Sequence, residues 1–347
     1  MKKTIIFAPN INNGGGFTLL RCFIERFLEG DVIYFLDIRT KNYFSKKINS
    51  DIVFWVSPNI ISRLSAELQL RKMVLAGDLV VLFNGLPPLL KNKGKVIGFL
   101  QNSLYFSPIK LKIGSFKTSL RILCERLILQ LFFFNVDIYI VQTKSMHEML
   151  KTFAGKMSSK KIISIKKFSF YDDSSFPSNL SVDKNLKFDF VYVADGNQHK
   201  NHTKLLDAWR LLSEEGFFPS LALTVGASYV DLISEIEGLI LKDRLNITNF
   251  GSLPQNEVFQ LYKSSAALIY PSLSESLGLP LYEAGKFGLS IVAAELDYVR
   301  DSCLPEQTFD PNSALSIARA VKRFCGINNE LDKISSVENF ISFIDDI

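Results

Sequence analysis

The sequence has little cysteine and histidine, which limits the kinds of site that it can hold. Its 347 residues include four cysteines and three histidines. The cysteines, Cys22, Cys124, Cys303 and Cys325, are far apart and show no metal-ligand spacing. This argues against both a disulfide framework and a zinc site, and we expect the cysteines to be reduced residues of the core.

Long hydrophobic runs are also lacking. The longest, Leu127–Val141, is interrupted by Gln130, Asn135 and Asp137 and is too short to span a bilayer as a helix. The first residues pass directly into an apolar, strand-like run without the cleavage site of a signal peptide. These features predict a cytoplasmic protein whose contact with a membrane is at most peripheral.

The composition is typical of a folded protein of two domains. Hydrophobic residues make up 47% of the chain and charged residues 22%, and the length suffices for two cores. Residues 1–170 contain 26 Lys and Arg against 10 Asp and Glu (+16), and residues 171–347 contain 14 against 25 (−11), which gives the net +5. The basic half is expected to meet an anionic partner. Because the chain has no nucleic-acid-binding motif, an anionic membrane surface or a lipid diphosphate fits better than nucleic acid.

Short apolar runs alternate with helical segments, which predicts an α/β architecture with parallel sheets. The expected strands are 3–8, 32–36, 52–56, 79–83, 96–100, 138–141, 188–193, 221–225, 247–250, 267–269 and 291–294. The polar segment 171–184 is the best linker between a first Rossmann-like domain (1–170) and a second one (185–325), which a helical tail (326–347) follows. A ligand of two such domains would lie in the cleft between them, at the C-terminal ends of the strands.

A pair of glutamates, Glu275 and Glu283, follows the expected strand at 267–269. Pro280 suits the first position of a helix and Gly288 its end, so Glu275 is expected on a loop and Glu283 in the first helical turn. The free amides of that turn form an anion site between the two carboxylates. Carboxylates suit sugar hydroxyls and a helix end suits phosphate, which together are the needs of a nucleotide-sugar.

The segment resembles the signature of the retaining glycosyltransferases of family 4, Pro-Ser-x-x-Glu-x-x-Gly-x-x-x-x-Glu-Ala. It matches this signature at Pro271, Ser272, Glu275, Gly278, Glu283 and Ala284. The resemblance is strong over residues 188–299 and general before them. It implies two Rossmann-like domains that face each other across a cleft (the GT-B fold), with Glu283 on the ribose diol and Glu275 on hydroxyls of the donated sugar. Three neighbours, Ser276, Leu277 and Leu279, would complete this part of the donor site together with Gly278.

Residues 195–202 resemble the phosphate-binding turn of this family, in which a Lys before Asn or Gly contacts the diphosphate of the donor. Lys200 would have that role, with Asn197 and Asn201 beside it. The family usually has an Arg on this loop, which this chain lacks, so Asn197, His199 or a basic residue of the first domain would have to replace it. The alternative is a solvated turn lysine.

The glycines Gly14, Gly15 and Gly16 follow the first expected strand as a loop before a helix at 17–27. They fit a tight turn or a ligand loop, and the resemblance favours a loop that lines the cleft between donor and acceptor. Gln101 and Asn102 stand near the point where many family members carry a His that faces the acceptor. Their amides can orient an acceptor hydroxyl but cannot act as a general base.

Two further glycines, Gly226 and Gly251, resemble the loops that hold the base of the donor, although a turn glycine is an equally good interpretation of each. No two aspartates are separated by a single residue, so the metal-binding Asp-x-Asp of the other major glycosyltransferase fold is absent. The resemblance implies chemistry without a metal, with a UDP-, GDP- or dTDP-sugar as the only cofactor-like ligand. The leaving phosphate oxygen would then act as the base on the same face of the sugar.

Apolar residues recur at helical spacing between residues 113 and 134. They are Ile113, Phe116, Leu120, Leu123, Leu127, Leu131 and Phe134, flanked by Lys110, Lys112, Lys117, Arg121 and Arg126. Such a segment lies in a membrane interface or packs its apolar side on the core. We expect the last two turns to face the core, and we leave both possibilities open for the first turns.

We therefore expect a glycosyltransferase that is peripheral to the membrane. Its acceptor is expected to be a glycan that is linked to a lipid. Synthesis of a bacterial surface polysaccharide such as O-antigen or capsule is its setting by analogy. Two alternatives stay open. One is another nucleotide-sugar enzyme of the same two-domain plan, an epimerase or a glycogen-type synthase, although the latter usually has a Lys before its glycines. The other is a non-catalytic protein that binds a glycan or a nucleotide, against which the intact glutamate pair and Lys200 argue.

Overall fold

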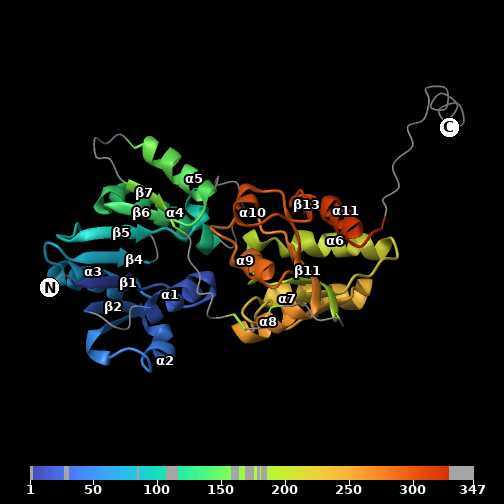
Figure 1. The fold of residues 1–347 in the computed structure, drawn as a ribbon, viewed down its shortest axis with the longest axis horizontal. Coiled ribbons are helices and arrows are strands. Elements are labelled where there is room, and N and C mark those ends of the chain that lie inside the picture. The colour runs from blue at the N-terminus through green and yellow to red at the C-terminus, as the bar shows by residue number, and fades with distance from the viewer. Residues whose placement is uncertain are drawn as a thin grey trace, which may run out of the picture.

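The computed structural model describes residues 3–26, 31–83, 86–106, 116–157, 164–168, 176–177, 180 and 186–327. Figure 1 shows two α/β halves side by side, with the first in blue to green and the second in yellow to red. Each half contains one parallel sheet. The fold class predicted from the sequence, two Rossmann-like domains with parallel sheets, is thus confirmed.

The sheet of the first half has the strand order β3-β2-β1-β4-β5-β6-β7. Its strands are β1 (Thr4–Ala8), β2 (Val32–Asp37), β3 (Val53–Val56), β4 (Leu79–Leu82), β5 (Lys95–Phe99), β6 (Ile138–Val141) and β7 (Ser164–Lys167). Its helices are α1 (Gly14–Arg26), α2 (Lys41–Phe44), α3 (Ile60–Met73), α4 (Phe116–Phe132) and α5 (Lys144–Gly155), with a 3₁₀ turn η3 (Ser103–Tyr105) after β5.

The sheet of the second half has the order β10-β9-β8-β11-β12-β13. Its strands are β8 (Phe188–Tyr192), β9 (Leu221–Leu223), β10 (Ile247–Asn249), β11 (Ser265–Tyr270), β12 (Ser290–Ala294) and β13 (Gln307–Phe309). Its helices are α6 (His202–Glu214), α7 (Val230–Asp243), α8 (Gln255–Lys263), α9 (Leu279–Lys286), α10 (Asp297–Ser302) and α11 (Ala314–Phe324), with a 3₁₀ turn η6 (Gln198–Lys200) before α6.

Both sheets have a topological switch point, where the strand order changes direction. In the first sheet it lies between β1 and β4, and in the second between β8 and β11. Loops that leave the carboxyl ends of such neighbouring strands diverge to opposite faces of the sheet and leave a crevice between them. The glycines follow β1, the Lys200 loop follows β8 and the Glu275 loop follows β11, so the switch points carry most of the predicted site.

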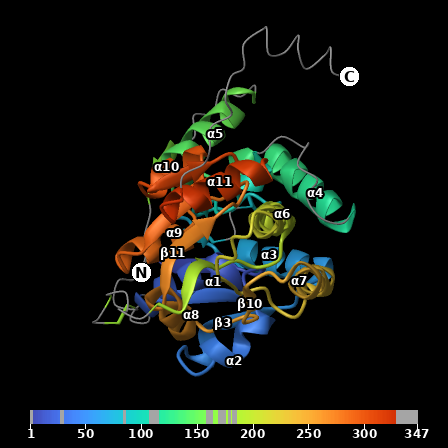
Figure 2. The ribbon, with the colours of Figure 1, turned by 90° about the vertical axis from the view of Figure 1, so that its right-hand side faces the viewer.

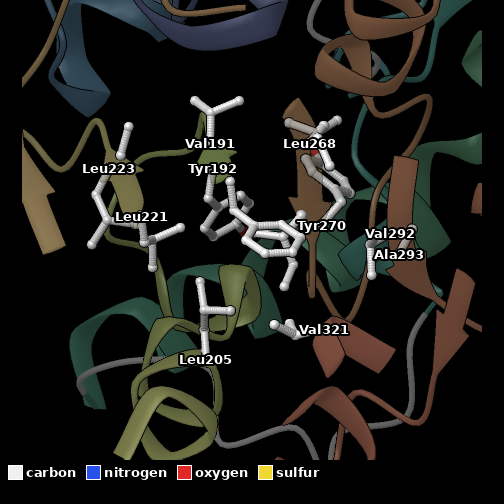
Figure 3. Packing of buried hydrophobic residues seen from close by; sticks show 14 of the residues in the cluster. Val191, Tyr192, Leu205, Leu221, Leu223, Leu268, Tyr270, Val292, Ala293 and Val321 are labelled. Atoms are coloured by element: carbon white, nitrogen blue, oxygen red, sulfur yellow. The ribbon is translucent and has the colours of Figure 1, made fainter. Parts of the chain in front are cut away.

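The core of the second half is built from almost continuous apolar strands. Figure 3 shows side chains of β8, β9, β11 and β12 packed with Leu205 of α6 and Val321 of α11. The ring of Trp209 on α6 lies edge-on to that of Phe190, with 5.7 Å between the ring centroids. Its Nε1–H donates a hydrogen bond to the carbonyl of Pro219 at 2.9 Å. Because helices cover both faces of a parallel sheet, its strands are buried on both sides. The loops at their carboxyl ends therefore rest on a rigid base.

Hydrogen bonds join the two halves at several points of the described chain. They are Arg21 Nη2 to Gln255 Oε1 (2.5 Å), Ser103 Oγ to Ser274 Oγ (2.7 Å), Thr143 Oγ1 to the carbonyl of Ser276 (3.1 Å) and the Ser145 amide to Asp301 Oδ2 (2.7 Å). The last bond places α5 against α10, and both ribbon views show these helices together (Figures 1 and 2). The loops that follow β5, β6 and β11 thus lie close to one another.

Several expectations need correction. The helix α1 begins at Gly14, so the three glycines form its first turn and are not a loop before it. Glu283 is the fifth residue of α9 and lies in its second turn, because the helix begins at Leu279 after the left-handed Gly278. Cys124 and Cys325 are exposed and are not core residues. The edge strands β7 and β13 were not predicted.

The apolar stripe of α4 faces outward, contrary to our expectation for its last two turns. Leu127 is 48% and Leu131 72% exposed, while the buried face of the segment carries Ile122, Leu129 and Phe133. At 3.6 residues per turn the two sets lie on nearly opposite sides of the helix. Leu129 and Phe133 pack into the core with the strands of the first sheet, and Ile122 packs against Leu104. The predicted flanking residues Lys110, Lys112 and Ile113 lie outside the described residues, as do the side chains of Phe116 and Lys117.

Two other predictions fall mostly beyond the described chain. The linker 171–184 is described only at 176–177 and 180, and the tail 326–347 only at its first two residues. Among the described helices, none combines the length and the apolar character that crossing a membrane requires.

Candidate functional site

Two loops at the switch point of the second sheet are joined directly. The carbonyl of His199, on the loop after β8, accepts the amide of Leu273 at 2.7 Å and lies 3.2 Å from the hydroxyl oxygen of Ser272. Ser272 is fully buried, and its own carbonyl accepts the hydroxyl of Tyr298 at 2.6 Å. The loop that carries Lys200 and the loop that carries Glu275 are therefore fixed relative to each other.

An ion pair links the two predicted catalytic residues. Lys200 Nζ lies 2.6 Å from Glu275 Oε1. The same oxygen accepts the hydroxyls of Ser272 at 2.7 Å and of Tyr270 at 3.0 Å. Glu275 Oε2 has no hydrogen-bond partner within the described part of the chain. One oxygen of this carboxylate is thus fully used in holding its position, and the other is available to a ligand.

The surroundings of Glu275 favour its ionised form. Burial by itself would raise the pKa of the carboxyl, but the charge of Lys200 and the hydrogen bonds from Lys200 and Ser272 outweigh it. The net effect is a pKa below the ordinary value. At neutral pH Glu275 is therefore a fixed anion, suited to accept hydrogen bonds from sugar hydroxyls and unsuited to donate a proton.

Hydrogen bonds from buried side chains fix the backbone around Lys200. The carbonyl of Lys200 accepts the hydroxyl of the fully buried Tyr192 at 2.6 Å. Asn201 has a left-handed conformation (φ 63°) and donates its side-chain amide to the carbonyls of Pro271 at 3.1 Å and Pro311 at 2.7 Å. Asn201, which was predicted to bind the nucleotide-sugar, thus uses its side-chain amide to fix the backbone at Pro271 and Pro311. Its place just before α6 leaves the first amides of that helix without intrahelical partners, beside Lys200.

The second glutamate of the motif is more deeply placed. Glu283 is 8% exposed, and its Oε2 accepts the hydroxyl of the fully buried Tyr262 at 3.1 Å. A carboxylate oriented in this way from a helix has few accessible conformations. The structure gives Glu283 a fixed position on α9, and the prediction that it holds a ribose diol stays a prediction.

A cavity of about 210 Å³ lies between the two halves beside Glu275. Residues of the first half line one side and residues of the second half the other. They are Gln101, Asn102, Ser103, Leu104, Arg121 and Ile122, facing Asn197, His199, Ser274, Glu275 and Ser276. The predicted residues Gln101, Asn102, Asn197, Glu275 and Ser276 are thus brought together in one cavity, which we call the cleft cavity.

The glycines of α1 bring the first half close to α9. A Cβ on Gly15 would lie 3.1 Å from Leu279 Cδ1, and one on Gly16 would lie 3.0 Å from Gln101 Oε1. Gln101 also donates its Nε2–H to the carbonyl of Phe83 at 2.8 Å. These distances leave little room for side chains at the two glycines, so the first turn of α1 can approach the donor loops closely.

The other predicted residues lie around this centre. Gly278 (φ 72°) turns the chain into α9, and Leu277 accepts the hydroxyl of Ser302 at 2.5 Å through its carbonyl. Gly226 and Gly251 lie on adjacent loops after β9 and β10, where a Cβ on Gly226 would lie 2.2 Å from Ser252 Oγ. Neither glycine lines the cleft cavity.

For two residues of the cleft cavity, the sequence did not predict the position or the role that the structure indicates. Arg121 was considered only as a flank of the α4 stripe, and no local pattern predicts that α4 crosses over η3 to reach the cleft. His199 was considered as a substitute cation for the diphosphate. Burial, with the nearby charge of Lys200, lowers its pKa, so a neutral imidazole faces the cavity and the role of a second cation does not suit it.

A larger cavity of about 910 Å³ lies outside the cleft, between α4, α5 and α10. Its apolar lining includes Tyr105, Phe106, Leu123, Leu127, Met149 and Phe153. Its charged lining includes Arg126, Lys144, Glu148, Lys156, Asp297, Arg300 and Asp301. We call it the α4 groove. Within the described ranges no cluster of His, Cys, Asp and Glu has the arrangement of a metal site.

Residues 176–336 match the family model described as glycosyl transferases group 1. This range is just under half of the chain and covers the second domain, which is thus similar to that family. A comparison with curated protein sequences finds no similar sequence.

The fold of the whole chain is similar to that of several solved structures. Sucrose-phosphate synthase from Thermosynechococcus elongatus has a TM-score of 0.66 and 16% identity, with 94% of this chain and 90% of that chain covered. Anabaena HepE in complex with UDP-glucose has a TM-score of 0.67, 14% identity and the same coverage. The lipopolysaccharide outer core galactosyltransferase WaaB has a TM-score of 0.58 and 15% identity, with 93% and 91% covered. This likeness establishes the two-domain GT-B fold.

His202, the first residue of α6, provides a test of the electrostatics around Lys200. It is 3% exposed, packs on Tyr192 at 4.9 Å between ring centroids, and neither ring nitrogen has a hydrogen-bond partner in the described chain. Burial, followed by the charge of Lys200, lowers its pKa to about 3. Below the ordinary histidine pKa of about 6.5 the unfolded chain binds a proton that the folded chain does not bind, so stability falls as the pH falls towards 3.

We expect His202→Phe, which keeps a ring against Tyr192, to reduce this acid sensitivity. The loss of unfolding free energy between pH 7 and pH 5 should be smaller than in the wild type by about 2 kcal/mol, from 1.36 kcal/mol per pH unit over about 1.5 units. Urea denaturation at both pH values measures it, with the pH 7 value as the reference for packing changes. An identical pH dependence in both proteins would contradict the burial of a neutral His202.

Proposed function

We propose that the chain is a retaining glycosyltransferase that moves a sugar from a nucleotide-sugar to a glycan acceptor. The observation that carries the proposal is the Lys200–Glu275 pair at the switch point of a domain similar to the glycosyl transferases group 1 family, beside a cavity that the other domain closes. An open carboxylate oxygen, a lysine and a helix N-terminus in one place meet the needs of a sugar and a diphosphate.

In the proposed reaction the bond between the anomeric carbon and the diphosphate oxygen breaks, and the acceptor oxygen bonds to the same carbon on the same face. The acceptor proton passes to the leaving diphosphate oxygen. Lys200 and the first amides of α6 stabilise the charge that develops on this oxygen, without a metal ion. Glu275 holds the sugar through hydroxyl contacts, and neutral His199, which also lines the cleft cavity, accepts a hydrogen bond from a ligand hydroxyl.

The two domains have different parts in this proposal. Glu283 on α9 would hold the ribose and the loops at Gly226 and Gly251 the base, which places the nucleotide in the second domain. Gln101 and Asn102 face Glu275 across the cleft cavity and would orient the acceptor. The narrow approach of Gly15 to Leu279 would close the site over the reacting sugar.

We further propose a lipid-linked acceptor, a peripheral position on the cytoplasmic face of a membrane and a role in bacterial surface polysaccharide synthesis. The exposed leucines of α4 support the membrane contact. Leu120, Leu123, Leu127 and Leu131 are 45–72% exposed along one helix, in the half with the excess of positive charge. Apolar surface of this kind beside basic residues is typical of a contact with anionic lipid. One structural neighbour is named as a lipopolysaccharide galactosyltransferase.

Lys200→Ala should lower kcat more than it raises the KM for the donor. A loss on the order of 2–4 kcal/mol of transition-state stabilisation is expected if the charge acts mainly as the bond breaks. Lys204→Ala, four residues further along and exposed beside Asp207, is the matched control and should leave kcat unchanged. Steady-state kinetics measure both variants, and a change in KM alone would reduce Lys200 to a binding residue.

Turnover in the presence of EDTA should equal turnover without it. Recovery by Mn²⁺ of an EDTA-inhibited enzyme would contradict metal-free chemistry.

Glu283→Ala should weaken the binding of a free nucleoside diphosphate, because a ribose contact exists with or without the sugar. Glu283→Gln should do less damage, since an amide oxygen still accepts a hydrogen bond. Tyr262→Phe, which removes the buried donor to Glu283, should give an intermediate affinity. Calorimetry with the nucleoside diphosphate measures all three, and an unchanged affinity in Glu283→Ala removes the ribose role.

The membrane contact predicts salt-sensitive sedimentation with vesicles that contain anionic lipid. Leu127→Glu combined with Leu131→Glu should abolish it, while transfer to a short soluble acceptor persists. The matched control is Leu241→Glu combined with Leu304→Glu, because these leucines are 83% and 88% exposed on the second domain. If the control variant loses sedimentation as fully as the α4 variant, or if the wild type does not sediment, α4 is not the membrane-binding face.

A further inference from the structure

Arg121 is a positive charge at the cleft cavity whose role is not yet accounted for. It projects from α4 of the first domain and lines the cavity opposite Asn197, His199 and Glu275. Its side chain is 67% exposed, and its Nε lies 3.9 Å from Glu125 Oε1, near the limit for an ion pair. Burial dominates the environment of Glu125 and raises the pKa of its carboxyl, so this carboxyl is a weak counter-ion.

The charges that the described residues bring to the cleft cavity do not balance without a ligand. Apart from His199, the charged residues among them are Arg121 and Glu275. Glu275 is already paired with Lys200 at 2.6 Å, so its charge is compensated from the donor side. The positive charge of Arg121 is left to face the cavity from the acceptor side. A ligand that fills this part of the cavity is best complemented if it carries an anionic group.

The position of Arg121 indicates where that anionic group lies on the acceptor. On α4, Arg121 and Ile122 line the cleft cavity, whereas Leu123 and Leu127 line the α4 groove. The same division occurs on η3 and the residue after it: Ser103 and Leu104 line the cleft cavity, and Tyr105 and Phe106 line the groove. Arg121 therefore lies at the junction of a polar site for a sugar and an apolar surface.

We propose that Arg121 binds a phosphate that joins the acceptor sugar to an apolar carrier chain. The sugar occupies the cleft cavity beside Glu275, and the chain follows the exposed leucines and the α4 groove. A guanidinium pairs with two phosphate oxygens at once, in a geometry that a lysine does not match. The inference rests on the proposed transferase function and deepens it, because the reacting sugar is then the one attached directly to the phosphate of a lipid.

Binding of simple amphiphiles tests the proposal without requiring turnover. The probes are octyl phosphate, octyl glucuronide as a carboxylate, and octyl glucoside as a neutral compound, each titrated calorimetrically below its micelle concentration. The wild type should bind octyl phosphate about 10- to 100-fold more tightly than octyl glucoside, the range for hydrogen bonds to a charged group. Octyl glucuronide should bind more weakly than octyl phosphate. Equal affinity for phosphate and neutral probes, or a preference for the carboxylate, would overturn the proposal.

Variants then assign the preference to Arg121. Arg121→Gln should reduce the preference for octyl phosphate to nearly none and leave octyl glucoside binding unchanged, and Arg121→Lys should retain part of it. Lys151→Gln is the matched control, because Lys151 is an exposed lysine of α5 that lines neither cavity, and it should bind like the wild type. A phosphate preference that survives in Arg121→Gln would place the phosphate site elsewhere and overturn the proposal.

Donor kinetics separate this inference from the proposed function. Hydrolysis of the nucleotide-sugar without an acceptor should have the same KM in Arg121→Gln and the wild type. A raised KM would make Arg121 a donor diphosphate ligand and overturn the acceptor role. If no nucleotide-sugar is hydrolysed or transferred by the wild type, the proposed function fails, whereas the phosphate preference at Arg121 is still decided by the titrations.

Discussion

The ion pair between Lys200 and Glu275 is the interaction on which the rest of the site depends. It joins the loop after β8 to the loop after β11 across the switch point of the second sheet. Both side chains are mostly buried, and hydroxyls of Tyr192, Tyr270 and Ser272 fix the pair from below. Removing one partner of such a pair typically costs about 3–5 kcal/mol, because a buried charge is left alone. The residues that would bind the donor therefore also hold the loops in place.

The two domains contribute to this site unequally. The second domain supplies the charged pair, the N-terminus of α6 and Glu283, which lie on loops and helices that pack on a sheet with apolar strands. The first domain supplies the first turn of α1, the residues after β5 and one face of α4. Hydrogen bonds such as that of Thr143 with the carbonyl of Ser276 connect these parts to the donor loops. A fixed donor site is thus combined with a surface that can differ according to the acceptor.

The sequence predicted the elements that have strong local signals. Buried parallel strands such as Ser265–Tyr270 are continuous apolar runs, and Gly278 with Pro280 indicates the start of α9. The edge strand Ser164–Lys167 was missed because it is short, polar and half exposed. In the site, Lys200 and Glu275 were predicted from the family resemblance, but their direct pairing was not, because it depends on how two distant loops meet. The cleft position of Arg121 and the outward face of the α4 leucines depend on the docking of α4, which its periodicity does not determine.

The central claim is that a nucleotide-sugar binds at the Lys200–Glu275 pair. The most direct measurement is a crystal structure of the protein with whichever UDP-, GDP- or dTDP-sugar raises its melting temperature most in a thermal-shift screen. The account predicts a diphosphate beside Lys200 Nζ and the first amides of α6, with a sugar hydroxyl on Glu275 Oε2 and the ribose at Glu283. A nucleotide bound in the α4 groove, with the Lys200–Glu275 pair undisturbed and unoccupied, would contradict it.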